Sequence, residues 1–397
     1  MREIHIPRYV TTLMERLETA GEEVYLVGGS LRDILLGLAP HDFDLATSAL
    51  PEKTLSLFSD HRVIETGVKH GTVTVISEGN PVEITTFRID GSYTDSRHPD
   101  GVTFTRRIVD DLARRDFTVN AMAYHPSVGL VDPFGGKEDL AACLLRAVGN
   151  PETRFTEDAL RIMRALRFSA QLSFSIEGGT RLGLATCRDG LASIAKERIA
   201  SELLRLLLSP DPYDALMTMT ECGITPYVLG GYRPTETICK TLYAAAPADG
   251  ARLGHLLSDA SQEEAQVCLS SLKYSGKQIT SALAVARGCH HTVTTPADAR
   301  RLIAACGAWA PAAVRSSVAL GISPPEAIGF VEENPAPCTL SELAVSGKDL
   351  TDLGFRGKAV GDTLHALLDA VLEDPTLNTR ESLLALLHTI KQSIPNS

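Results

Sequence analysis

The feature that most constrains the fold of this chain is a change in its residue pattern near residue 150. Before that point, apolar and polar residues alternate in short stretches such as 71–76 (GTVTVI) and 81–88 (PVEITTFR), which is typical of half-buried β-strands. After it, apolar residues recur at helical spacing and no convincing strand follows. The 397 residues are too many for one ordinary core. We therefore predict an α+β protein in which a small head precedes a long all-α body.

The composition favours a soluble, cytoplasmic protein. No apolar run approaches the roughly 18 residues that suggest a membrane span, and the N-terminus, MREIHIPRYVTTL, carries charges where a signal peptide needs an apolar core. The eight cysteines form no CxxC pair, which predicts buried free thiols in a reducing cytosol. Cys289-His290-His291 lacks partners at metal-ligand spacing and is interpreted as a loop or helix end.

The charge is distributed unevenly. The net charge of −11 argues against a strongly basic nucleic-acid binder. Residues 151–210, however, contain nine Lys and Arg against seven Asp and Glu. Any contact with RNA must therefore use local clusters, and this central segment is where we expect them.

Two acids define the first candidate site. Asp42 and Asp44, in the text HDFDLAT, lie two residues apart on an expected strand, so their carboxylates point to the same face. Two such carboxylates repel each other unless a cation lies between them, and Mg²⁺ prefers a few carboxylates together with substrate phosphates. A pair of Mg²⁺ ions about 4 Å apart could clamp the attacking and leaving oxygens of a phosphoryl transfer. Two solvated loop acids would show the same spacing.

The residues just upstream make the pattern more specific. In LVGGSLRD, Gly28 and Gly29 lie between an expected strand and an expected helix, where backbone N–H groups can approach a triphosphate. Arg32, one turn into that helix, can reach a phosphate. Glu83, on an expected neighbouring strand, is the candidate for a third metal-site acid; the alternative is a surface Glu on an edge strand.

At these residues the sequence resembles a known family. GGSLRDILLGLAPHDFDLAT is similar to the first motif of the DNA polymerase β-like nucleotidyltransferases, and more closely to that of the bacterial and eukaryotic (class II) CCA-adding enzymes and their poly(A) polymerase relatives. Further stretches match in order: RRDFTVNA (114–121), DPFGG through RAVG (132–149), Glu157-Asp158 with Arg161, Arg164 and Arg167, ERI with Glu202-Leu203 (197–203), and the tail SGKDLTDLGFRGKAVGDTL (346–364).

The resemblance assigns a template role to the pair Asp158 and Arg161. We expect them to be neighbours, i and i+3, on one helix. Asp accepts a hydrogen bond and Arg donates one, which matches the amino group and ring nitrogen of cytosine and of adenine but not the reversed edges of uracil and guanine. The alternative is an ordinary ion pair. Arg164 and Arg167 continue the row and are expected to meet the triphosphate or the RNA backbone.

The resemblance also implies roles for other residues. Arg115 would bind the triphosphate and Asp116 a ribose hydroxyl. The stretch 90–104, with Asp90 and Arg97, resembles the family's flexible loop, which helps the switch from C to A addition. The family's usual sequence in this loop is closer to two consecutive arginines before a proline. Gly135 and Gly136 would form a hinge.

As a whole, the resemblance implies a polymerase β-like head with a mixed sheet, followed by an elongated helical neck, body and tail. The expected segments are the catalytic head (1–149), the neck with its nucleotide-selecting helices (150–210), and the tRNA-binding body (211–291) and tail (292–397). The implied activity is template-independent addition of C, C and A to tRNA from CTP and ATP, with Mg²⁺ as cofactor and no membrane partner.

Three alternatives remain. A poly(A) polymerase shares the first motifs, but the expected basic strand and basic C-terminal extension are replaced by TGVKHGTVTV and KQSIPNS. An enzyme that adds only A has motifs that do not separate it from a full CCA enzyme. A non-catalytic RNA- or nucleotide-binding protein would not need Asp42, Asp44 and Arg32.

Overall fold

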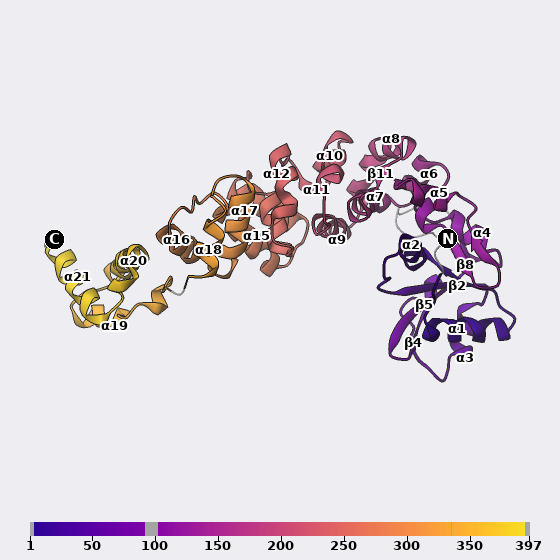
Figure 1. The fold of residues 1–397 in the computed structure, drawn as a ribbon, viewed down its shortest axis with the longest axis horizontal. Helices are drawn as coiled ribbons and strands as arrows, with labels where there is room; N and C mark the ends of the chain where they lie inside the picture. The colour runs from indigo at the N-terminus through magenta and orange to yellow at the C-terminus, as the bar shows by residue number, and fades with distance from the viewer. Residues whose placement is uncertain (1–3, 92–101, 335, 394–397) are drawn as a thin grey trace. The chain divides into compact units, whose positions relative to one another are not determined.

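The structure is a computed structural model that describes residues 4–91, 102–334 and 336–393 (Figure 1). The chain divides into two compact units, Met1–Gly231 and Tyr232–Ser397, which we describe separately. The boundary lies inside the expected body segment 211–291, and the division into head, neck, body and tail remains a prediction. The predicted α+β class is confirmed, because the main sheet lies in the first part of unit 1 and the later elements are almost all helices.

Unit 1 contains strands and helices. Its strands are β1 (Val24–Val27), β2 (Phe43–Thr47), β3 (Arg62–Ile64), β4 (Thr72–Ser77), β5 (Asn80–Thr86), β6 (Arg88–Asp90), β7 (Val102–Phe104), β8 (Ala123–His125), β9 (Gly129–Val131), β10 (Leu144–Leu145) and β11 (Ser175–Ile176). Its helices are α1 (Arg8–Thr19), α2 (Gly28–Leu36), α3 (Pro51–Leu57), α4 (Ile108–Ala113), α5 (Gly136–Ala141), α6 (Pro151–Glu157), α7 (Leu160–Leu172), α8 (Gly178–Cys187), α9 (Lys196–Leu207), α10 (Tyr213–Glu221) and α11 (Thr225–Leu229).

A mixed seven-stranded sheet organises the head, in the order β3-β4-β5-β2-β1-β8-β9. All pairings within it are antiparallel except β2 with β5, which is parallel. Every residue of β1 is buried, because helices cover both faces of the sheet: α1 and α3 pack on one side and α2 on the other (Figure 1). α1 is amphipathic, with Val10, Leu13, Met14 and Leu17 buried at helical spacing.

Two expectations about the region after residue 150 need correction. The short strand β11 pairs in parallel with β10, so the helical region does contain a strand, although only of two residues. In addition, the helix expected to contain Asp158 is broken there. α6 ends at Glu157, α7 begins at Leu160, and Asp158 has the extended backbone angles φ −141° and ψ 102°.

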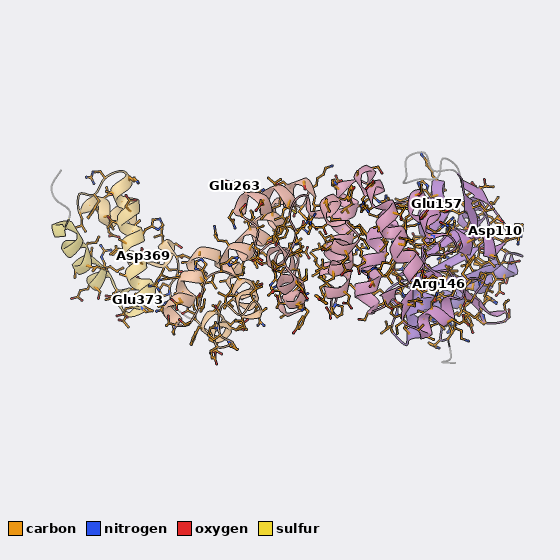
Figure 2. All side chains as sticks on the ribbon, turned by 90° about the horizontal axis from the view of Figure 1, so that it is seen from above. Asp110, Arg146, Glu157, Glu263, Asp369 and Glu373 are labelled. Carbon is orange, nitrogen blue, oxygen red and sulfur yellow. The ribbon has the colours of Figure 1, made fainter. Side chains whose placement is uncertain are left out.

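Unit 2 is helical throughout its described residues. Its helices are α12 (Glu236–Thr241), α13 (Asp249–Leu256), α14 (Gln262–Ser271), α15 (Gly276–Gly288), α16 (Pro296–Cys306), α17 (Ala310–Ala319), α18 (Ala327–Glu332), α19 (Gly347–Asp352), α20 (Lys358–Glu373) and α21 (Arg380–Ser393). One apolar core forms among α16, α17 and α18, and another among α19, α20 and α21. Arg300 of α16 joins these groups, because its buried guanidinium donates to the carbonyls of Leu372 and Glu373 at the end of α20, where Figure 2 labels Glu373.

One stretch of unit 2, Pro296–Ala319, is long and apolar enough to cross a membrane by length and composition alone. In the structure this stretch is two helices, α16 and α17, separated at Gly307, whose φ is +54°. Its buried residues form the core that these helices share with α18. The stretch therefore behaves as core helices in the fold.

The cysteines follow the sequence expectation in most cases. All eight are free, and six of them are buried, whereas Cys143 is exposed and Cys187 partly buried. Cys289 ends α15, and the neighbouring His290 Nε2 lies 2.7 Å from the carbonyl oxygen of Ser258. Cys289-His290-His291 is therefore a helix end, as expected.

Candidate active site

One large cavity in unit 1, of about 900 Å³, gathers the predicted site residues. It lies where the start of α2, the start of β2, β5 and the segment after α4 face α7 and α9. The predicted residues that line it are Gly28, Gly29, Arg32, Asp42, Asp44, Glu83, Arg115, Asp116, Asp158, Arg161, Arg164 and Arg167. Asp90 ends β6 but its side chain is not described, Arg97 lies outside the described residues, and Gly135 and Gly136 do not line the cavity.

Three acids meet at the sheet edge of the cavity. Asp44 and Glu83 are register partners on the parallel strands β2 and β5, so their side chains lie next to each other on one face, and Asp42 precedes β2 by one residue. Burial raises the pKa of Asp44 to about 6, and the charges of Glu83 and Asp42 add to this rise, whereas the charge of Arg115 opposes it. The acids therefore repel one another.

This acid group fits a hard cation such as Mg²⁺, because its donors are carboxylate oxygens whose charges need compensation. Within the described ranges, no three His, Cys, Asp or Glu side chains lie close enough to surround an ion by themselves. The protein would thus supply part of a coordination sphere and leave the remainder to water and substrate phosphates, which is the usual arrangement for Mg²⁺.

The glycine turn brings its backbone next to these acids. Gly28 begins α2 with φ +71°, a left-handed conformation that glycine adopts without steric cost. A Cβ on Gly28 would lie 3.2 Å from Nη1 of Arg115 and 3.4 Å from Oδ2 of Asp44. The absence of a side chain at Gly28 therefore leaves space between the Arg115 guanidinium and the Asp44 carboxylate. This space lies at a helix N-terminus, which favours anions.

Arg32, the phosphate ligand expected from the sequence, also has protein partners. Its Nε and Nη2 donate to Asp33 at 2.9 and 2.7 Å, and its Nη1 donates to Asn120 at 2.8 Å. The side chain is buried. These bonds hold Arg32 in the cavity wall and use three of its five N–H donors, so its role as a phosphate ligand remains a prediction. Arg115 is the guanidinium adjacent to Asp44.

Asp116 lies at the centre of a buried network. Its Oδ2 accepts from Nε and Nη2 of Arg164 at 2.8 and 2.6 Å, and its Oδ1 accepts from Asn120 and the backbone of Phe117. Burial alone would raise the pKa of Asp116, but the adjacent Arg164 guanidinium holds it at about 2. All of its roughly four lone-pair sites are used, so a ribose hydroxyl would have to replace one of these bonds.

Phe168 forms an aromatic floor that the sequence reasoning did not assign. The guanidinium carbons of Arg32, Arg164 and Arg167 lie 5.2, 5.3 and 3.9 Å from its ring centroid. The face of an aromatic ring attracts cations at such distances. The three arginines are also neutralised by their own carboxylates, which are Asp33, Asp116 and Glu202, respectively.

Asp158 and Arg161 both line the cavity, but they are not the helical i, i+3 pair expected from the sequence. Asp158 lies in the break between α6 and α7, where its Oδ1 accepts from the backbone N–H of Leu160 at 3.0 Å. Its Oδ2 pairs with Nη2 of Arg198 at 3.3 Å. The alternative expectation, an ordinary ion pair between Asp158 and Arg161, is therefore not observed, and Asp158 pairs with Arg198 of α9.

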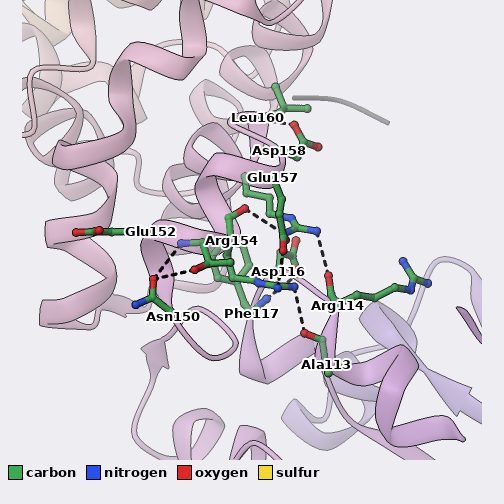
Figure 3. A network of polar contacts seen from close by, with 12 residues as sticks. Ala113, Arg114, Asp116, Phe117, Asn150, Glu152, Arg154, Glu157, Asp158 and Leu160 are labelled. Carbon is green, nitrogen blue, oxygen red and sulfur yellow. Dashed lines mark hydrogen bonds and ion pairs between the residues drawn. The ribbon is translucent and has the colours of Figure 1, made fainter. Parts of the chain in front are cut away.

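Arg161 is held by a network that includes Glu157 and Arg154, which Figure 3 labels. Its Nη1 donates to Glu157 at 2.6 Å, and its Nη2 donates to the carbonyl of Arg114 at 3.0 Å. Glu157 also accepts from Arg154 at 2.6 Å, and Arg154 donates to the carbonyl of Ala113 at 3.2 Å. The two arginines thus bind the carbonyls at the C-terminal end of α4 and fix the Arg161 guanidinium at the cavity.

Several cavity residues received no role from the sequence: Asp33, His41, Thr85, Arg114, Asn120, Phe168, Gln171, Arg198 and Arg205. Five of them lie inside the motifs quoted above, which was the available signal: Asp33, His41, Arg114, Asn120 and Arg198. Gln171 and Arg205 come from later turns of α7 and α9, and nothing local in the sequence distinguishes them from surface residues.

Of the two hinge candidates, Gly136 packs tightly in the structure, whereas a Cβ on Gly135 would make only an ordinary contact with Glu138 at 3.6 Å. A Cβ on Gly136 would lie 2.2 Å from the carbonyl oxygen of Thr118, which only a shift of backbone could relieve. The carboxylate of Asp132 also accepts from the backbone N–H groups of Gly136 and Lys137. Close packing accounts for Gly136, and the hinge role remains a prediction.

Comparisons with known proteins agree with this geometry. Residues 24–146 match the family described as the poly A polymerase head domain, and residues 173–233 match a probable RNA and SrmB-binding site of polymerase A. The CCA-adding enzyme of Leuconostoc mesenteroides is 49% identical over 55% of this chain and 54% of its own, so the chain spans about half the length of that relative.

Two further matches extend over nearly the whole chain. The CCA-adding enzyme of Limosilactobacillus fermentum is 38% identical over 94% of both chains. The crystal structure of the Bacillus stearothermophilus CCA-adding enzyme in complex with CTP superposes with a TM-score of 0.81 at 30% identity, covering 98% of this chain and all of the other. Sequence motifs, fold and cavity thus agree, and the chain belongs to the family of class II CCA-adding enzymes, nucleotidyltransferases with a poly(A) polymerase head.

Proposed function

We propose that this protein adds C, C and A to the 3′ end of tRNA, using CTP and ATP and releasing pyrophosphate. The observation that carries the proposal is that one cavity contains the three acids, the glycine turn and the Asp158 and Arg161 side chains. The CTP complex of the related Bacillus enzyme supports the nucleotide assignment. The free cysteines favour a reducing compartment, and we propose the cytoplasm as the site of action.

The chemistry assigns separate tasks to the residues. Asp42, Asp44 and Glu83 would hold magnesium in a two-ion site, and the bound metal would activate the tRNA 3′-hydroxyl and stabilise the leaving pyrophosphate. Arg115 and the backbone at Gly28 and Gly29 hold the triphosphate beside these acids. Positioning of the two reacting groups and electrostatic stabilisation of the phosphoryl oxygens together supply the rate enhancement in such transfers.

Base selection is assigned to Asp158 and Arg161. Arg198 and the Leu160 N–H orient the Asp158 carboxylate as an acceptor, while Glu157 and the carbonyl of Arg114 orient Arg161 as a donor. This edge pairs with cytosine and adenine and opposes uracil and guanine. Each correct polar contact contributes roughly 1–3 kcal/mol of discrimination by analogy with base readout in nucleic-acid complexes.

The test is incubation of the protein with a tRNA that lacks its CCA end, with CTP alone, ATP alone, or both. Products longer by two residues with CTP and by three with both nucleotides would support the proposal. No extension of this tRNA, together with growth by one A of a tRNA that ends in CC, would indicate an A-adding enzyme, and long A tails a poly(A) polymerase.

Two variants test the assigned roles. Asp42→Ala is expected to abolish incorporation while the protein remains folded, and retained activity would contradict the magnesium assignment. Arg161→Ala is expected to admit UTP or GTP, and unchanged selectivity would contradict the template assignment.

A further inference from the structure

Asp111 is a fully buried acid just outside the cavity, with 0% of its surface exposed. It lies on the short helix α4, three and four residues before Arg114 and Arg115. A carboxylate removed from water is costly unless cations and hydrogen-bond donors compensate it. The partners of Asp111 therefore indicate what the chain gains from burying a charge at this position.

The two oxygens of Asp111 have different partners. Oδ1 accepts from Nε and Nη2 of Arg114 at 3.0 and 2.8 Å, and from the backbone N–H of Arg88 at 3.3 Å. Oδ2 accepts from Nη2 of Arg115 at 3.0 Å. Burial would raise the pKa of Asp111, but the charges of Arg115 and Arg114 hold it below its usual value, so the acid is ionised.

Arg115 has few other restraints in the part of the chain that the structure describes. Its Nη1 makes a long contact of 3.5 Å with the carbonyl oxygen of Asn120, and its Nε is buried without a hydrogen-bond partner. Its one ion pair there is with Asp111. The orientation of the Arg115 guanidinium thus depends mainly on Asp111.

A competing carboxylate lies close by. Nη1 of Arg115 and Oδ2 of Asp44 both lie within 3.4 Å of the point where a Cβ on Gly28 would be, yet these two side chains form no ion pair in the described residues. Without Asp111, attraction would draw the guanidinium towards Asp44. The donors of Arg115 would then face an acid of the catalytic group in place of an incoming phosphate.

We propose that Asp111 is a positioning residue that holds Arg115 away from Asp44 and directs its free donors to the nucleotide triphosphate; this rests on the proposed function of the cavity. Asp111 does not touch substrate itself. Arg114 and the backbone of Arg88 secure Asp111 through one oxygen, which leaves the other oxygen for Arg115.

The experiment is equilibrium binding of CTP to the full-length protein in EDTA, which measures triphosphate recognition without metal or chemistry. Asp111→Asn is expected to weaken binding about tenfold, which corresponds to one lost charge-assisted hydrogen bond. Arg115→Gln is expected to weaken it by a similar factor. In the double variant, Asp111→Asn should add less than a twofold loss, because its effect passes through Arg115.

Asp110→Asn is the matched control. Asp110 is the neighbouring acid of α4, and it accepts from the hydroxyl of Thr105 rather than from Arg115. It should bind CTP within twofold of the unchanged protein. A tenfold loss for Asp111→Asn that persists in the Arg115→Gln background would show a general structural role and overturn the proposal, as would unchanged CTP binding by folded Asp111→Asn.

A second variant covers the case in which Asp111→Asn fails to fold. Asp111→Glu retains the charge but moves the carboxylate by one methylene, and it should also weaken CTP binding only when Arg115 is present. A separate outcome identifies failure of the proposed function itself. If the unchanged protein binds CTP but extends no tRNA, the CCA-adding proposal falls while the link between Asp111 and Arg115 can still be measured by binding.

Discussion

The glycine turn allows a test in which backbone strain and active-site obstruction can be separated. Gly28→Ala places a methyl group 3.2 Å from Nη1 of Arg115 and 3.4 Å from Oδ2 of Asp44. The backbone at this position has φ +71°, which costs an alanine about 1–2 kcal/mol. The substitution should therefore lower stability modestly and also displace the Arg115 guanidinium next to Asp44.

The effect on catalysis should exceed the effect on stability. The contact to Arg115 is tighter than ordinary van der Waals contact, so the guanidinium must move by a few tenths of an ångström. The methyl also occupies space beside Arg115 and Asp44 that the proposed function assigns to the triphosphate. Misplacement of reacting groups by about 1 Å can cost about 100-fold in rate, so we expect kcat/KM to fall by roughly 10- to 100-fold.

Two other glycines provide matched controls. Gly21 and Gly79 have φ values of +81° and +82°, and a Cβ on either would meet nothing within 4 Å. Gly21→Ala and Gly79→Ala should thus share the strain of Gly28→Ala without its obstruction. Thermal unfolding of the three variants should shift by similar amounts, and CTP incorporation into tRNA should fall strongly only for Gly28→Ala. Equal activity losses in all three, or full activity in Gly28→Ala, would refute the reasoning.

Three further predictions concern other parts of the molecule. Arg154→Gln should loosen Arg161 and raise misincorporation of UTP relative to CTP in single-nucleotide assays, and unchanged selectivity would contradict the network in Figure 3. His255 is fully buried, and burial lowers its pKa to about 4, so the unfolded chain binds the proton more readily than the folded protein. The contribution of His255 to the free energy of unfolding should therefore be complete above about pH 6.5 and fall by up to about 3 kcal/mol as the pH drops towards 4. Urea titrations should show that His255→Gln removes this part of the pH dependence. Arg300→Gln should destabilise unit 2 by about 2 kcal/mol, because the carbonyls at the end of α20 lose their hydrogen bonds to the guanidinium. Arg301→Gln, which breaks an exposed ion pair, should cost less than about 1 kcal/mol in the same measurement.

The parts of the site that depend on local pattern could be predicted from the sequence. Alternation along β2 and β5 was sufficient to bring Asp44 and Glu83 to one cavity, because side chains on a strand alternate between its faces, and Asp42 lines the same cavity from the residue just before β2. The glycine turn was likewise predictable, since a strand ending in two glycines before a helix has few other conformations.

Residues whose role depends on distant partners were less predictable. Asp158 was placed on a continuous helix, but its carboxylate bonds to the Leu160 N–H and to Arg198, forty residues away. The local preference of Asp for helix starts was a signal for this break. The sequence analysis assigned nothing to Asp111, and only the fold reveals that the side chains of Arg114 and Arg115 and the backbone of Arg88 surround it.

The parallel pairing of β2 with β5 has a consequence for how the chain can vary. Val82 and Ile84 are buried on one face of β5 while Glu83 shares the opposite face with Asp44, and the tight turn at Glu78 and Gly79 sets where that strand begins. Inserting a single residue between the turn and Glu83 would exchange odd and even positions, moving the carboxylate into the apolar layer and a valine into the cavity. A second inserted residue would return the carboxylate to the cavity face but would move it two positions along β5, away from its partner Asp44, so the length of one short hairpin decides whether the third acid is available.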